Sequence, residues 1–158
     1  MKFIFSSLLL CTVLFIMSCN SDDNSTDTGN NNNGVGQDSM ALTIDGTAYR
    51  WAASGAKNSS FYLIAGADAS GKSVTLSFTN LTATGTHSTS GGLFSMTYGT
   101  GSSTTYSATF AAGTATANVT ELGSKVKATF SGTLNRTSGS GGNATVSITA
   151  GAFNVTPN

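Results

Sequence analysis

The acidic side chains that could act in acid–base catalysis are few in this sequence and far apart. Between residues 40 and 158 they are Asp45, Asp68 and Glu121. Hydrolysis by paired carboxylates needs two acids held a few ångströms apart, whereas Asp45 and Asp68 stand in Gly- and Ser-rich contexts that are typical of turns. No catalytic residue is therefore predicted, and the chain is expected not to be an enzyme.

His87 is the only histidine of the chain, which limits nucleophilic and metal chemistry. A Ser-His-Asp triad would have to use it, but no nucleophile-elbow motif lies beside it. A zinc site needs several imidazole or thiolate ligands, and Lys72 stands where a calcium loop starting at Asp68 needs an oxygen ligand. No metal site and no cofactor are predicted, and His87 is expected to be exposed in a Thr/Ser-rich loop.

Aromatic side chains are the best candidates for a ligand site. Tyr49 and Trp51 alternate along one expected strand, so both side chains share a face. They form either a platform on which a sugar ring stacks or a pair of large core residues with a polar tip at the rim. The core role is favoured, and the platform is kept as the alternative.

Cys19 is the one residue with a clear chemical assignment. It follows a run of about fifteen mostly apolar residues, 3–17, which is short for a membrane span of about 20 residues and typical of a secretory signal. Ile16-Met17-Ser18-Cys19 is similar to a lipobox, in which a peptidase cuts before a cysteine whose sulfur receives a diacylglyceryl group. Residues 1–18 are predicted to be a lipoprotein signal peptide and Cys19 the lipidation site; an uncleaved anchor is the alternative.

The positions of the two cysteines also predict that the mature domain has no thiol. Cys11 lies inside the signal and would leave with it, while Cys19 would carry lipid. The domain would then have no disulfide, no thiolate nucleophile and no cysteine-bound zinc. Two or more acyl chains, such as palmitate, give stable membrane anchoring, so the expected partner of the N-terminus is a membrane.

Residues 19–39 are predicted to be a flexible acidic and Asn-rich tether. The segment 20–37 has Val35 as its only aliphatic residue and cannot bury enough apolar surface to become ordered. Its start, Cys19-Asn20-Ser21-Asp22-Asp23, is similar to the acidic export signal of surface-exposed Bacteroidota lipoproteins. Asp38-Ser39-Met40 is similar to the O-glycosylation acceptor of that phylum, with Ser39 as the candidate acceptor.

The charge of the domain does not suit nucleic acid. Charged residues make up only 9% of the chain. From residue 40 onward six basic residues stand against three acidic ones, a net charge of +3. They are scattered, whereas a nucleic-acid surface needs Lys and Arg gathered on one face. No nucleic-acid partner is expected.

From Met40 onward, apolar and polar residues alternate with a period of two, which indicates β-strands. The sequence around Asp45-Gly46 predicts a hairpin with a type I′ turn, and Phe61–Ala65, apolar on both faces, predicts a central strand. Further strands are expected at 73–79, 84–87, 93–98, 106–110, 114–122, 125–134 and 145–155. About nine short strands predict one all-β domain at 40–158, a single antiparallel β-sandwich or flattened barrel.

Several short motifs together resemble small flavobacterial-type outer-membrane lipoproteins of Bacteroidota, whose function is unknown. They are the lipobox, the Asp-rich spacer, Ile44-Asp45-Gly46 followed by aromatics, Thr84-Gly85-Thr86, and a closing strand from Ile148 to Val155. His87 departs from the family pattern, which often has an aromatic residue there. The resemblance implies a lipid-anchored, surface-exposed β domain on the outer membrane, and it implies no activity.

The sequence thus predicts a non-enzymatic, lipid-anchored cell-envelope protein with an interaction or structural role. The alternative is a surface glycan-binding module that uses Tyr49 and Trp51 as its platform. A glycan or another envelope protein is the expected partner beyond the membrane.

Overall fold

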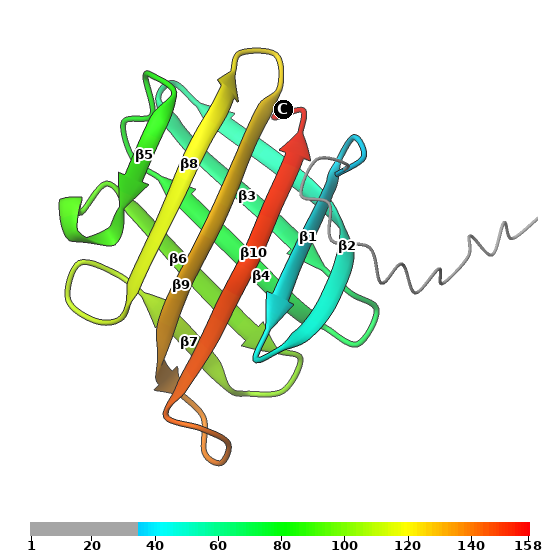
Figure 1. Cartoon of the computed structure of the whole chain (residues 1–158), viewed down its shortest axis with the longest axis vertical. Coiled ribbons are helices and arrows are strands. Elements are labelled where there is room, and N and C mark those ends of the chain that lie inside the picture. The colour runs from blue at the N-terminus through cyan, green and yellow to red at the C-terminus, as the bar shows by residue number, and fades with distance from the viewer. Residues whose placement is uncertain (1–34) are drawn as a thin grey trace, which may run out of the picture. The chain divides into compact units, whose positions relative to one another are not determined.

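The computed structural model describes residues 35–158, which form one antiparallel β domain (Figure 1). Apart from one short 3-10 turn, all of its regular elements are strands. The strands are β1 (Ser39–Ile44), β2 (Thr47–Asn58), β3 (Phe61–Ala67), β4 (Lys72–Phe78), β5 (Gly85–Ser88), β6 (Phe94–Thr100), β7 (Thr105–Ala108), β8 (Thr114–Leu122), β9 (Val126–Ser138) and β10 (Thr145–Val155); the 3-10 turn η1 is Thr89–Gly91.

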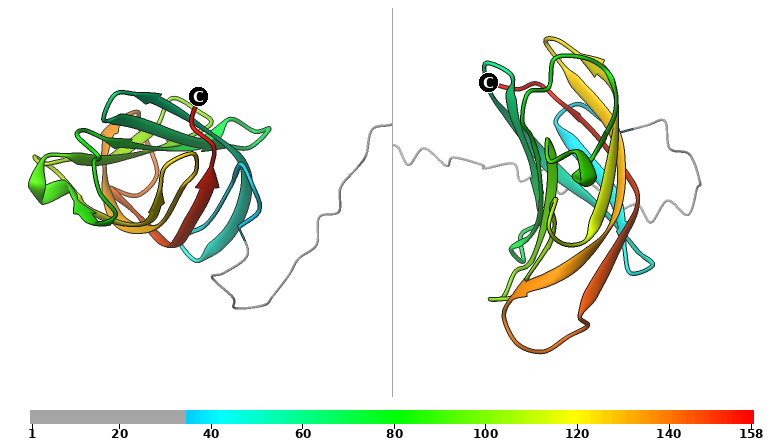
Figure 2. Two further views of the ribbon diagram at one scale, coloured as in Figure 1. Left: turned by 90° about the horizontal axis from the view of Figure 1, so that it is seen from above. Right: turned by 90° about the vertical axis from the view of Figure 1, so that its left-hand side faces the viewer.

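Eight of the ten strands close into a barrel. The order of pairing is β1-β2-β3-β4-β6-β7-β9-β10, and β10 pairs again with β1. The barrel is flattened in cross-section (Figure 2). The prediction of an all-β antiparallel domain is confirmed, and of the two architectures expected from the sequence the flattened barrel is the one formed. Closure satisfies the strand edges that an open sheet would leave unpaired.

The long strand β9 joins the barrel to the two extra strands, because two strands share one of its edges. Residues 126–133 of β9 pair with β8, and residues 135–138 of the same edge pair with β7. Its other edge pairs with β10 along nearly its whole length. β8 therefore branches away from the barrel, and β5 adds to its outer edge (Figure 1).

The first hairpin follows directly from turn chemistry. Asp45 and Gly46 have φ angles of 46° and 82°, the positive values that both central residues of a type I′ turn need. Ile44 pairs with Thr47 across this two-residue loop. The prediction of the hairpin is confirmed. Asp45 also ties the turn to β10, because its Oδ1 accepts a hydrogen bond of 2.8 Å from the Ser147 N–H.

The alternation of residue types places one continuous core inside the barrel. On β4, Val74, Leu76 and Phe78 are almost fully buried, as their spacing predicts. Inward residues of the other strands complete the interior: Met40, Leu42, Ile64, Phe94, Met96, Val119, Val126, Phe130, Leu134, Ile148 and Phe153. A small eight-stranded barrel is just wide enough for side chains to fill, so the sites open to a ligand lie outside it or at its ends.

The chain enters the barrel through a clamped segment just before β1. The Asp38 Oδ1 accepts a 2.8 Å hydrogen bond from the Thr156 N–H and another of 3.0 Å from the Gln37 side chain. These two donors, in that order of effect, lower the pKa of the Asp38 carboxyl. The clamp fixes the start of β1 to the chain that follows β10.

A second carboxyl group with a lowered pKa, that of Asp68, lies in the β3–β4 turn. The Asp68 Oδ1 accepts hydrogen bonds from the Ser70 hydroxyl at 2.7 Å, the Ser70 N–H at 2.8 Å and the Lys72 N–H at 3.0 Å. The Ser70 hydroxyl has the largest effect on the pKa. The turn that the sequence context of Asp68 predicts is thus formed and held by its own aspartate, as in Asx-turns.

The lowered pKa values of Asp38 and Asp68 predict that the domain loses stability in acid. A carboxyl whose pKa is lower in the folded chain stabilises the fold above its unfolded pKa of about 3.9 and loses that contribution as the pH falls through the folded value. The melting temperature should therefore fall below about pH 4, and less steeply in the variant Asp38→Asn/Asp68→Asn. Thermal melts from pH 7 to pH 2.5 test this; parallel curves for the two proteins would contradict it.

Candidate functional site

The structure places the predicted aromatic pair at the wall of the core. Trp51 is only 5% exposed and belongs to the core, while Tyr49 is half-buried beside it. Their ring centroids are 5.5 Å apart and the ring planes are inclined by 50°. The two residues do share a face, as the alternation predicts, but Trp51 offers no open ring surface. This is the core role that the sequence favoured.

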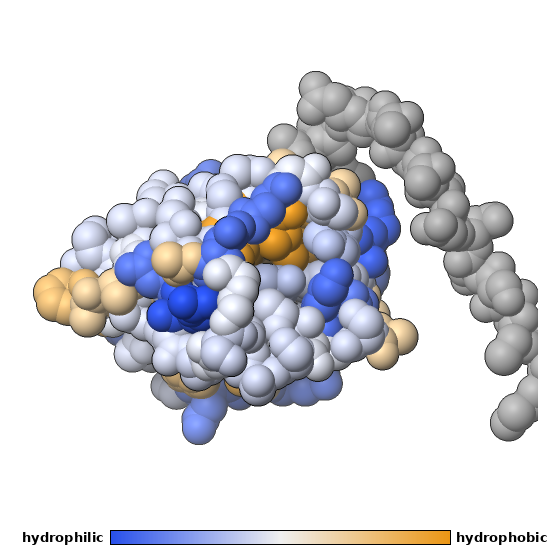
Figure 3. Space-filling view, turned by 90° about the horizontal axis from the view of Figure 1, so that it is seen from below, coloured by the Kyte–Doolittle hydropathy of each residue, from blue (hydrophilic) through white to orange (hydrophobic). Residues whose placement is uncertain are grey.

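Tyr49 is also covered, by a lysine from the neighbouring turn. The Lys72 Nζ lies 4.9 Å from the Tyr49 ring centroid and donates a 3.3 Å hydrogen bond to its hydroxyl. This bond is the main reason that the pKa of Lys72 is raised. The barrel end that carries the β3–β4 turn is mostly pale or blue, with a small recessed apolar area (Figure 3). A sugar would have to displace Lys72 to stack on Tyr49.

Each of the three acidic residues between positions 40 and 158 has a structural partner. Asp45 and Asp68 accept backbone hydrogen bonds that stabilise their turns. The Glu121 carboxylate pairs with the Lys127 Nζ at 2.7 Å. No three His, Cys, Asp or Glu side chains within residues 35–158 lie where they could hold a metal ion. These hydrogen bonds and this ion pair stabilise turns and the β8–β9 strand pair.

His87 differs from its sequence expectation, because it is half-buried and not exposed. β5 pairs with β8, which turns the imidazole inward, edge-on to Phe78 at 5.9 Å between ring centroids. Its Nε2 is buried with no hydrogen-bond partner among the described residues. The exposure was predicted wrongly although a strand was expected at 84–87, because the pairing of β5 with β8 decides which way the ring points.

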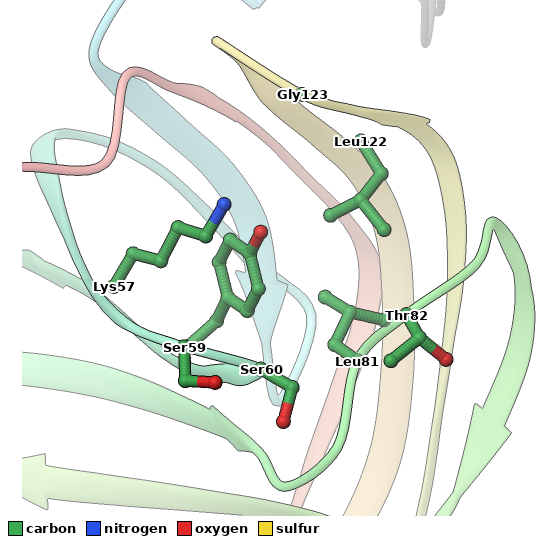
Figure 4. A pocket seen from close by; sticks show the side chains of 8 residues that line it. Lys57, Ser59, Ser60, Leu81, Thr82, Leu122 and Gly123 are labelled. Carbon is green, nitrogen blue, oxygen red and sulfur yellow. The ribbon is translucent and has the colours of Figure 1, made fainter.

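A cavity of about 540 Å³ lies at the barrel end where the β2–β3 turn, the β4–β5 loop and the β8–β9 turn meet (Figure 4). Lys57 stands on one side, with its Nζ 5.3 Å from the Tyr62 ring centroid, and Leu81 and Leu122 face it (Figure 4). Tyr62 and Leu81 are each only 3% exposed. The cavity is therefore a shallow mouth above the sealed core, with one cation at its rim.

A second depression, of about 370 Å³, lies on the outer face of β8, β9 and β10. We call it the hydroxyl trough. Two rows of exposed hydroxyl side chains flank it, and the first row crosses all three strands. The first row is Thr114, Thr133 and Ser147. The second contains the pair Thr116 and Ser131, with Thr149 on β10 where the β9–β10 register shifts. None of the residues that line the trough is charged or aromatic.

An exposed aromatic residue stands at one end of the trough. Phe110 was expected inside a strand at 106–110, but β7 ends at Ala108 and the chain turns back between Thr109 and Ala112. This turn leads directly into Thr114 of the first row, and Phe110 at its tip is 75% exposed. Strand alternation alone could not reveal this residue, although the Gly113 that follows, with a φ of 72°, is a turn signal.

The remaining predicted sites lie at or before the start of the barrel. Ser39 is half-buried as the first residue of β1, and its hydroxyl donates a 2.6 Å hydrogen bond to the Gly36 carbonyl. The signal segment 1–18, Cys19 and most of the predicted tether lie outside the described residues. Within residues 35–158 no helix has the length and apolar character needed to cross a membrane.

Comparisons with protein-family models, with curated proteins and with solved structures found no significant match.

Proposed function

We propose that this chain is a non-enzymatic, lipid-anchored cell-envelope protein whose barrel is held at the outer-membrane surface to bind a partner. The observation that carries the proposal is Ile16-Met17-Ser18-Cys19 at the end of the apolar run, with Cys19 as the only thiol after the expected cleavage site. The acidic sequence that follows Cys19 and the resemblance to small Bacteroidota lipoproteins support display on the cell surface.

The way in which the chain enters the barrel suits a tethered domain. β1 lies between β10 and β2, and Asp38 and Gln37 bond to Thr156 just before β1 begins. A pull along the preceding segment therefore acts first on this clamp and then on two ladders of backbone hydrogen bonds. A strand held on both edges resists such a pull better than an edge strand does, because both ladders must break.

The non-enzymatic role is supported by the acids of the domain, each of which already stabilises a turn or an ion pair. Glycan binding is the second candidate function. It is favoured by the hydroxyl trough, a neutral polar depression on the outside of the barrel, and no longer needs Tyr49 and Trp51 as a platform.

The anchor is tested by replacing one cysteine at a time. In the native host, Cys19→Ala should move the protein from the membrane fraction to the soluble fraction, because it removes the sulfur that carries the acyl chains. Cys11→Ala is the matched control, since it changes a cysteine inside the signal, and it should leave the protein in the membrane fraction.

Fractionation followed by immunoblotting reads out both variants. A Cys19→Ala protein that stays in the membrane fraction would contradict the lipid anchor.

A further inference from the structure

We propose that the hydroxyl trough and Phe110 together form a binding site for a neutral polysaccharide chain, which lies across β8, β9 and β10 with one sugar ring stacked on Phe110. The inference rests on the proposed binding role and names its ligand class and its site. It replaces the platform of Tyr49 and Trp51 by residues that solvent reaches.

The pairing of the strands sets the hydroxyl groups in regular rows. Thr114 pairs with Thr133, which pairs with Ser147, and Thr116 pairs with Ser131. Adjacent hydroxyls in a row are thus one strand spacing apart, about 5 Å, and the two rows are two residues apart along the strands, about 7 Å. An extended sugar chain, with hydroxyl groups along both edges, can bond to both rows at once.

The floor of the trough between the two rows is strand backbone, because the residues between the rows point into the barrel. Gly132 separates Ser131 from Thr133 on the central strand and pairs with Ala115 on one side and Ile148 on the other. A Cβ on Gly132 would meet the Cε of the buried Met96 at 2.8 Å, so this position faces the core. Between the two rows a ligand therefore meets strand backbone and no outward side chain.

The hydroxyls of the trough are available to a ligand. Within residues 35–158, none of the six side chains in the two rows has a hydrogen-bond partner for its hydroxyl. On the opposite outer face, by contrast, the Thr97 and Ser107 hydroxyls bond to each other at 3.3 Å. The trough thus offers unused donors and acceptors, which a polyhydroxylated ligand can satisfy.

Phe110 adds the apolar surface that the trough itself lacks. Its Cδ2 lies 3.9 Å from the point that a Cβ on Gly92 would occupy, and the Gly92 N–H caps η1 by bonding to the Thr89 carbonyl at 3.0 Å. Ser88 and Ser90, on either side of Thr89, line the trough. The ring is therefore held against the turn that closes this end of the trough, with most of its surface open.

The charge of the site selects neutral ligands. No residue that lines the trough is charged, and the carboxylate at its β10 side, Asp45, already accepts the Ser147 N–H. An anionic polysaccharide would lose its hydration without gaining a cation, which is costly. Uncharged hexose or pentose polymers are the class that fits.

The test is affinity electrophoresis of the detergent-solubilised full-length protein through gels that contain a neutral polysaccharide (β-glucan, α-glucan, xylan or mannan) or anionic alginate. Retardation by at least one neutral polymer and none by alginate is expected. Phe110→Ala and Thr116→Val/Thr133→Val should each weaken the binding by about tenfold, the effect of losing one or two net contacts of about 1 kcal/mol.

Two control variants remove the same kinds of side chain at positions outside the trough. Phe61→Ala removes an exposed aromatic residue on β3, and Thr75→Val/Thr97→Val removes two hydroxyls of the opposite outer face. Both should bind like the wild type. Circular dichroism melts of all four variants show whether each one is folded.

Several results would overturn the inference. Loss of binding in the controls and not in the trough variants would show that the polysaccharide binds outside the trough. The protein would then still be a glycan-binding protein. No retardation by any neutral polymer, in a protein that still fractionates with the membrane, would remove this site and leave the anchor standing. Self-association that depends on Phe110 would show that a second copy of the chain covers the trough.

Discussion

Replacing Trp51 by Ala is expected to lower the free energy of unfolding by about 3–5 kcal/mol, the usual cost of deleting a buried aromatic side chain. Trp51 is almost fully buried in the barrel interior and packs against Tyr49. The loss is a large part of the roughly 5–15 kcal/mol that stabilises a typical domain. An account in which Trp51 is an open sugar platform predicts a change near zero.

Urea unfolding followed by far-ultraviolet circular dichroism measures this change, because Trp51 is the only tryptophan and the variant has no tryptophan fluorescence. Phe110→Ala is the matched control: it also removes a large aromatic ring, but one on the surface, so its change should stay within about 0.5 kcal/mol. Equal effects of the two substitutions would contradict the placement of both rings.

The second large effect is expected at Gly132, in the middle of β9. A Cβ there would lie 2.7 Å from the Thr114 carbonyl oxygen, 2.7 Å from the Ala115 Cβ and 2.8 Å from the Met96 Cε. The Met96 side chain can move, but the backbone of β8 is fixed by its pairing with β9. Gly132→Ala should therefore cost about 1–3 kcal/mol of stability, and Gly132→Val should cost more.

Gly123→Ala, in the β8–β9 turn, is the control for this substitution. Nothing lies within 4 Å of the Cβ that it would add, so the change should be neutral, or stabilise by up to about 1 kcal/mol by restricting the unfolded chain. The two midpoints of urea unfolding, compared with that of the wild type, test the prediction. A Gly132→Ala protein as stable as Gly123→Ala would show that the strands are not packed this closely.

The local part of the fold could be predicted from the sequence. Asp45-Gly46 determines its turn because an aspartate and a glycine tolerate the two positive φ angles. Val74, Leu76 and Phe78 point inward because side chains alternate along a strand. Both features depend only on residues within one or two strands, so the periodicity and the turn residues are sufficient.

Closure of the barrel and the trough depend on pairing between distant segments, which no local pattern contains. The sequence does not indicate that β7 and β8 share one edge of β9. The first row of hydroxyls exists only because Thr133 of β9 pairs with Thr114 of β8 and with Ser147 of β10, and Thr and Ser occur on most strands of this chain. Phe110 and His87 were misplaced for the same reason, since neighbouring strands decide where β7 ends and which way β5 faces.

The central claim is that this barrel is displayed on lipid chains carried by Cys19. The most direct test is the intact mass of the protein purified from the membranes of its native host. A mature chain that begins at Cys19 and carries the added mass of a diacylglyceryl group, with or without a further acyl chain on the amine, is the predicted result. A chain that keeps residues before position 19 and carries no lipid would contradict the claim.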